Sequence, residues 1–127
     1  MAAHRYWRAW GMEPYDNGAV IELTEFQLLV GTSRVDASAT LTASNGANVA
    51  ALSDGSAGSS VSLPRGVTLI WDFGASPQDV TDIRLGSSAN PLRFSLMATL
   101  QWSDDGALWT TASVSYTHLT LPTTPYV

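Results

Sequence analysis

Two adjacent carboxylates, Asp104 and Asp105, lie with Gly106 between two tryptophans in the segment LQWSDDGALWT. Paired carboxylates can hydrolyse glycosides, but they must then face each other across a substrate, roughly 5–9 Å apart. Neighbouring residues at a strand end point in different directions. Asp also accepts hydrogen bonds from nearby backbone in turns, and Gly readily adopts a positive φ. The segment therefore favours a hairpin turn over a catalytic pair or a metal site.

Other catalytic groups are scarce in this sequence. His4 is the only histidine before residue 114, and cysteine and lysine are absent. A Ser-His-Asp site would have to use His4, and we favour a solvated terminal histidine instead. The segment DGSAGSS is rich in glycine, but it lacks the Gly-Lys-Ser/Thr end of a phosphate-binding loop. We therefore expect no enzyme and no organic cofactor.

Length and charge narrow the class of protein further. A chain of 127 residues makes one domain, which buries roughly two-thirds of its unfolded surface on folding. The net charge is −5, and the six arginines are scattered singly, which argues against nucleic acid as a partner. No apolar run approaches the roughly 20 residues that span a bilayer, and MAAHRYWRAW lacks the apolar core of a signal peptide. We expect no membrane insertion.

Alternating apolar residues predict several short strands. The segment FSLMATLQWS places Phe94, Leu96, Ala98, Leu100 and Trp102 on one face. In GVTLIWDFG the corresponding residues are Val67, Leu69, Trp71 and Phe73, and DVTDIRLG supplies Val80, Ile83 and Leu85. HRYWRAW carries aromatics on both faces, DASATLTAS is a weaker strand, and NVAALSDG favours one helical turn. Clusters of Gly, Ser, Asn and Pro separate these segments, as in an antiparallel sandwich.

The segment GAVIELTEFQLLVG changes its alternation in the middle. Ile21 and Leu23 share one parity, whereas Phe26 and Leu28 share the other. A β-bulge adds one residue and switches faces, so the change predicts a bulge at Thr24–Glu25. A helix is the alternative, but Val, Ile, Thr and Phe favour a strand. Glu22 and Glu25 are then solvent-facing or bulge residues.

The last residues, 114–127, have no charge and no regular period. Residues 114–123, VSYTHLTLPT, are similar to the translation of a transposon-end and adapter sequence used in sequencing libraries. We interpret 114–127 as a non-native tail of this origin, rather than a natural Thr/Pro-rich linker, and exclude it from fold reasoning. Residues 1–113 then form the domain, and we expect the native chain to continue beyond Ser113.

The order of these segments resembles that of discoidin-type domains, also called coagulation-factor type C or galactose-binding-like domains, as found in bacteriophage tail proteins. HRYWRAW resembles their first strand, and VIELTEFQL resembles the second, with its characteristic glutamate at Glu25. NVAALSDGSAGSS is similar to their short turn and Asp-Gly loop, and SDDG before Trp-Thr is similar to their late hairpin. The resemblance implies an antiparallel jelly-roll β-sandwich that lacks its last native strand.

The resemblance also implies a metal option at the Asp-Gly loop. In the family this loop often binds a structural calcium, here through Asp54 and the backbone near Gly55. Calcium needs six to eight oxygen ligands, and the family's last strand, which supplies a further carboxylate, is missing. The loop also departs from the family's Phe-Asp-Gly followed by Thr and Trp. A calcium site and a plain Asp-Gly turn both remain open.

Aromatic residues suggest where a ligand could bind. Three tryptophans lie on apolar faces and are better explained as core residues: Trp7, Trp71 and Trp102. Trp10 and Tyr15 border the loop GMEPYDNG and are better placed for an exposed platform, with Asp16 and Asn17 as hydrogen-bonding partners. These four residues are the predicted ligand site.

Two functions fit these observations. The first is a non-enzymatic adhesion module of a phage tail or extracellular surface protein, which binds a glycan or another cell-surface group. The second is a structural decoration or assembly domain that contacts other virion subunits and has no small-molecule ligand. Because acidic residues outnumber arginines, we expect a neutral or cationic ligand rather than a polyanion.

Overall fold

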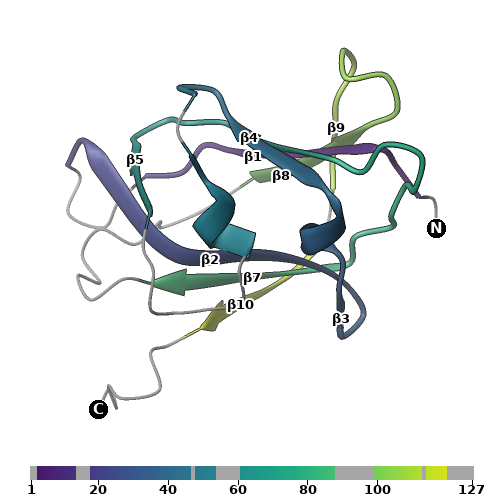
Figure 1. The fold of residues 1–127 in the computed structure, drawn as a ribbon, viewed down its shortest axis with the longest axis horizontal. Helices are drawn as coiled ribbons and strands as arrows, with labels where there is room; N and C mark the ends of the chain where they lie inside the picture. Colours follow the sequence, from purple (N-terminus) through teal and green to yellow (C-terminus); the bar gives the residue numbers. More distant parts are fainter. Residues whose placement is uncertain are drawn as a thin grey trace.

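A computed structural model describes residues 3–13, 18–46, 48–53, 61–87, 99–112 and 114–119. These residues form an all-β fold of two sheets, with only two short 3-10 turns, η1 (Asp36–Ser38) and η2 (Ala50–Ser53). Figure 1 shows one sheet above the other, with β4, β1 and β8 in the upper layer and β2, β7 and β10 in the lower. The predicted all-β architecture is confirmed.

The first sheet has the strand order β4-β6-β1-β8-β9. Its strands are β1 (Tyr6–Trp10), β4 (Thr40–Ala43), β6 (Leu69–Asp72), β8 (Thr99–Ser103) and β9 (Thr110–Thr111). All neighbours in this sheet are antiparallel. The chain therefore brings together segments that lie up to about a hundred residues apart, with β1 at the centre between β6 and β8.

The second sheet has the order β10-β7-β2-β3, and β5 also pairs with β2. Its strands are β2 (Val20–Val30), β3 (Ser33–Arg34), β5 (Val61–Pro64), β7 (Asp82–Ser87) and β10 (Ser115–Leu119). β10 pairs with β7 in parallel, whereas the other pairs are antiparallel. The segment that we interpret as a non-native tail thus contributes an edge strand here, and its origin stays a prediction.

The core lies between the two sheets and follows the predicted alternation. The predicted inward faces of two segments are buried: Val67, Leu69, Trp71 and Phe73 in the first, and Val80, Ile83 and Leu85 in the second. Trp7 is also buried, and Trp71 packs against Phe26 with 4.9 Å between ring centroids. Trp102 is partly buried against the same core. Hydrophobic burial between the layers thus selects which face of each strand points outward.

The predicted bulge in the long second strand is confirmed. The pairing of β2 with β7 shifts register between Leu23 and Glu25, which lets residues of both parities reach the core. Opposite the bulge, a Cβ on Gly86 would collide with the Thr24 hydroxyl and press against Glu25. The glycine in β7 therefore permits the close approach of the bulged strand. The bulge also explains why β2 is buried on both of its faces.

Two further predictions have partial outcomes. The predicted strand from Phe94 to Ser103 appears as β8 from Thr99, because residues 88–98 lie outside the described ranges. The predicted helical turn in NVAALSDG appears as η2. In the part of the chain that the structure covers, no helix is long and apolar enough to cross a membrane.

Candidate functional site

Asp105 forms the turn that follows β8. Its Oδ1 accepts hydrogen bonds from the backbone N–H groups of Ala107 (2.8 Å) and Leu108 (3.0 Å), and from the Ser103 hydroxyl (2.9 Å). These bonds, the one from Leu108 first, hold the pKa of the Asp105 carboxyl below its usual range. Gly106 has a φ of +78°, as a tight turn requires. The turn prediction is confirmed for Asp105.

Asp104 points elsewhere and binds His4. The Nδ1 atom of His4 lies 2.9 Å from Oδ1 of Asp104, and the imidazole stacks on Trp102 at 3.5 Å between ring centroids. His4 is only 8% exposed, so its interpretation as a solvated terminal histidine was wrong. The reason is tertiary: backbone hydrogen bonds between His4 and Gln78 hold the start of the chain against the loop after β6.

The predicted ligand site is described only at Trp10. This residue ends β1, opposite Thr99, and its side chain is 44% exposed, as expected for a platform residue. Tyr15, Asp16 and Asn17 lie outside the described residues, so their place beside Trp10 stays a prediction.

The predicted calcium site at Asp54 and Gly55 cannot be compared with the structure either. Asp54 and Gly55 directly follow η2 and lie outside the described residues. Within the described ranges, no three side chains of His, Cys, Asp or Glu gather as metal ligands would. The Asp-Gly calcium site therefore stays a prediction.

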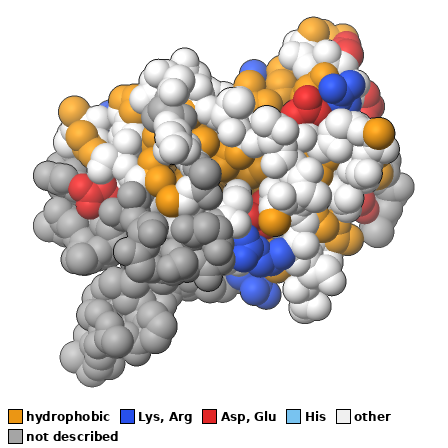
Figure 2. Space-filling view, viewed as in Figure 1, with side chains coloured by type: hydrophobic (Ala, Val, Ile, Leu, Met, Phe, Trp, Pro, Cys, Tyr) orange, Lys and Arg blue, Asp and Glu red, His pale blue; other side chains and the backbone are white. Residues whose placement is uncertain are grey.

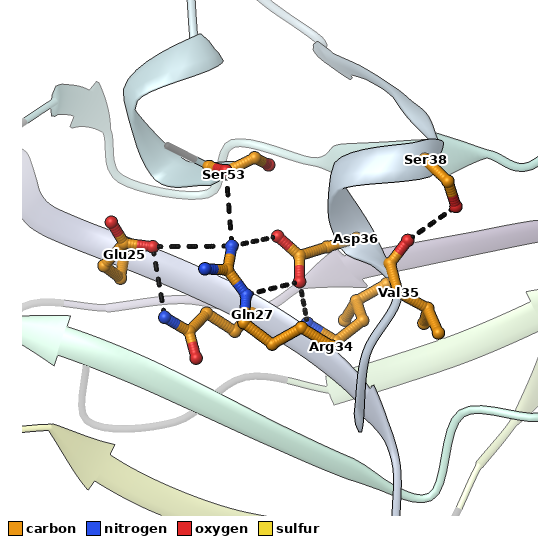
Figure 3. A network of polar contacts seen from close by, with 8 residues as sticks. Glu25, Gln27, Arg34, Val35, Asp36, Ser38 and Ser53 are labelled. Carbon is orange, nitrogen blue, oxygen red and sulfur yellow. Dashed lines mark hydrogen bonds and ion pairs between the residues drawn. The ribbon is translucent and has the colours of Figure 1, made fainter. Parts of the chain in front are cut away.

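A polar cluster with three buried side chains, Glu25, Gln27 and Asp36, lies between β2, β3 and the two 3-10 turns (Figure 3). Arg34 donates hydrogen bonds to both carboxylate oxygens of Asp36 (2.8 and 3.2 Å) and to the Ser53 carbonyl (3.2 Å). Asp36 is fully buried and also accepts a hydrogen bond from the Leu28 backbone N–H. Glu25 lies 3.9 Å from the Arg34 guanidinium. We call this group of residues, to which Ser53 contributes its backbone carbonyl, the buried corner: Glu25, Gln27, Arg34, Asp36 and Ser53.

The buried corner ties elements together rather than forming a cleft. Glu25 occupies the bulge, as predicted, but it is 2% exposed rather than solvent-facing, and Gln27 donates a hydrogen bond to it (3.3 Å). A buried carboxylate without compensation is costly, so Arg34 and Gln27 stabilise it in place. Sequence reasoning missed this cluster because nothing in the sequence indicated that Asp36 is buried beside Arg34.

A different group of side chains lies on the outer side of the first sheet. Because Trp7, Ala9 and Leu100 point to the core, their neighbours along each strand point away from it. Cross-strand pairing brings these neighbours side by side. We call this surface the open face, and it consists of Tyr6, Arg8, Trp10, Thr40, Thr42, Ile70, Asp72, Thr99, Gln101 and Thr111, with Trp109 beside it.

Arg8 lies at the centre of the open face. Its Nε donates a hydrogen bond to Oε1 of Gln101 (2.8 Å), and its guanidinium carbon lies 4.3 Å from the ring centroid of Trp109. Gln101 in turn donates a hydrogen bond from Nε2 to the Thr111 hydroxyl (3.2 Å). The four side chains form a polar and aromatic strip across β1, β8 and β9. Arg8, Gln101 and Trp109 are partly exposed on the outer side of the sheet, and Thr111 is exposed.

Arg5 and Asp72 lie at the end of the open face near Tyr6. Arg5 donates two hydrogen bonds to the Asp72 carboxylate (2.9 and 3.2 Å), and its guanidinium lies 4.8 Å from the Tyr6 ring centroid. The Arg5 bonds, with one from the Gly74 backbone, lower the pKa of Asp72 below its usual range. The same contact raises the pKa of Arg5. This pair is therefore internally neutral.

The arginines of the described residues thus have different partners. Arg5, Arg34 and Arg65 form ion pairs with Asp72, Asp36 and Glu13. In contrast, the partners of Arg8 among the described residues are an amide and an indole ring, both neutral. Figure 2 shows, at the end of the molecule near β9, basic and acidic side chains next to one another.

Part of the open face could have been found from sequence. The segment YWRAW alternates around Trp7 and Ala9, which places Tyr6, Arg8 and Trp10 on the other side of one strand. The contribution of Gln101 and Trp109 could not, because it depends on which strand pairs with β1.

In comparisons with known proteins, no family model, no curated protein and no solved structure matches the chain.

Proposed function

We propose that this chain is a non-enzymatic adhesion module that binds a glycan on a cell surface, as part of a phage tail or other extracellular particle. The observation that carries the proposal is the arrangement of Arg8, Gln101 and Trp109 on the open face, with the exposed Trp10 on the same strand. Sugar rings offer an apolar face to stack on indole rings and hydroxyls to bond planar polar groups.

The dimensions of the open face fit a short stretch of a glycan chain. Tyr6 and Trp10 lie four residues apart on β1, which corresponds to about 13 Å along a strand. Hydroxyl groups of Thr42 and Thr111 lie in the same cross-strand row as Arg8 and add hydrogen-bonding partners. An extended ligand could therefore contact several of these side chains at once.

Affinity at one such site should be low. Each stacking or hydrogen-bonding contact contributes about 1 kcal/mol, and an open surface leaves much of a ligand in water. Many copies on one particle would raise the effective affinity by multivalency. Weak single sites in many copies are what we expect of a domain on a phage tail. The proposal therefore includes the resemblance to the discoidin-type jelly rolls of phage tail proteins.

A second candidate function is subunit assembly without a small-molecule ligand. Leu108, in the turn after β8, is 79% exposed. Leu108 and Trp10 are the two large apolar side chains that are exposed among the described residues. Such residues are common at contacts between proteins. In this case the two residues would be covered in an assembled particle.

A glycan array probed with monomeric and multimerised protein tests the proposal. We expect a sugar signal that is stronger for the multimer, and a loss of roughly three- to tenfold in affinity for Trp10→Ala or Trp109→Ala, because stacking is removed. Leu108→Ser is the matched control, because it removes the exposed apolar side chain next to Trp109, and it should bind the glycan with unchanged affinity. Salt-sensitive binding to DNA or anionic lipid, without any sugar signal, would contradict the proposal.

A further inference from the structure

Arg8 has hydrogen-bonding capacity that no described residue uses. A guanidinium carries N–H donors on all three of its nitrogens, in a planar fork that matches a carboxylate. Within the described part of the chain, Gln101 is the one residue that accepts a hydrogen bond from Arg8, and it takes the Nε donor. The two terminal nitrogens of this partly exposed side chain have no acceptor among the described residues.

The guanidinium is also held in position before any ligand arrives. Trp109 contacts its face, and Gln101 is itself oriented by the bond from its Nε2 to Thr111. A side chain that is already ordered loses less entropy on binding than a free surface arginine. The neighbouring residues thus act as positioning residues for Arg8.

The charge around Arg8 favours an acidic group. Asp72, which pairs with Tyr6 two residues along β1 from Arg8, is held by two hydrogen bonds from Arg5 and is compensated by it. Charges beyond about 8 Å are largely screened at physiological salt, so the negative net charge of the chain has little effect at this point. The whole-chain argument for a neutral or cationic ligand therefore does not hold locally at Arg8.

Building on the binding function proposed above, we propose that the glycan carries a carboxylate, as uronic and sialic acids do, and that Arg8 binds this carboxylate with its two terminal nitrogens. The sugar ring would then lie along β1 toward Trp10, which is about 7 Å away on the same face. A charged, bidentate hydrogen bond is specific for a planar carboxylate.

The test uses matched ligands. Polygalacturonate, alginate, hyaluronan and polysialic acid are each compared with their carboxyl-reduced forms on the multimerised protein. We expect at least one native polymer to bind on the order of tenfold to a hundredfold more tightly than its reduced form. Equal binding of native and reduced forms, or preference for a sulfated galactan that has no carboxylate, would overturn the carboxylate assignment and leave the glycan-binding function intact. Absence of binding to every glycan would overturn both.

Variants of Arg8 provide the second arm. Arg8→Gln should abolish the preference for the native polymer, and Arg8→Lys should restore only part of it, because an ammonium cannot bind bidentately. Arg84→Gln on β7, in the other sheet, removes the same charge and should leave the preference unchanged. Unfolding midpoints of all three variants establish that the domain is folded. A preference that survives in Arg8→Gln would refute the role of Arg8.

Discussion

The buried corner and the open face are each built around one arginine, and they differ in what surrounds it. Arg34 is enclosed by the carboxylates of Asp36 and Glu25 and by a backbone carbonyl. Arg8 is held by a neutral amide and an indole ring, and it lies on the outer side of the sheet. In the first case carboxylates compensate the charge of the guanidinium, and in the second the described residues accept only its Nε donor and carry no compensating charge in direct contact.

The largest expected effect is in the buried corner. Asp36→Ala removes the carboxylate from Arg34 and from the Leu28 N–H, which should lower the free energy of unfolding by about 3 kcal/mol. Asp36→Asn is the matched control, since it keeps the volume and one acceptor, and it should cost less. Urea denaturation of both variants checks this. A loss below about 1 kcal/mol for Asp36→Ala would mean that the cluster does not stabilise the fold.

The bulge that places Glu25 in this corner should be sensitive to Gly86. A methyl group there collides with Thr24, so Gly86→Ala should destabilise the domain by about 2 kcal/mol. Gly31→Ala is a less suitable control because its positive φ adds strain, whereas Ala43→Gly reports the ordinary cost of a strand glycine. Thermal unfolding compares them. If Gly86→Ala unfolds at the wild-type temperature, the two strands do not approach as closely as described.

Protonation of Asp72 and Asp105 at low pH should destabilise the domain. The pKa values of Asp72 and Asp105 are lowered in the folded state, so both groups bind protons more weakly there than in the unfolded chain. Their contribution to stability is therefore present at neutral pH and is lost as the pH falls below about 4. In Asp72→Asn/Asp105→Asn, unfolding midpoints measured from pH 6 to pH 2.5 should fall less steeply. An unchanged slope would show that other groups control acid unfolding.

The smallest expected effect on stability is at Arg8. Arg8→Gln removes one cation–π contact and one hydrogen bond, both only partly buried, which should change the free energy of unfolding by at most about 1 kcal/mol. Measured beside Asp36→Ala, it tests the contrast between the two arginines directly. A loss for Arg8→Gln as large as that for Asp36→Ala would make Arg8 a structural residue as well.

Several elements could be predicted because their causes are local. The parity change between Leu23 and Phe26 marked the bulge, and the residues of SDDG marked the turn that Asp105 now stabilises. Alternation around Trp71 identified which face of β6 is buried. In each case neighbours within a few residues decide the outcome, because strand alternation and turn geometry are properties of short segments.

The contacts of His4 and of the two arginines could be identified only from the tertiary structure. His4 is buried by Trp102 and bonded to Asp104, a hundred residues away, and Arg8 meets Gln101 across ninety-three residues. The sequence by itself determined that β1 has an inner and an outer side. Only the pairing of β1 with β8 decided what stands beside Arg8, because contacts between distant segments depend on strand order and register, which local propensities do not encode.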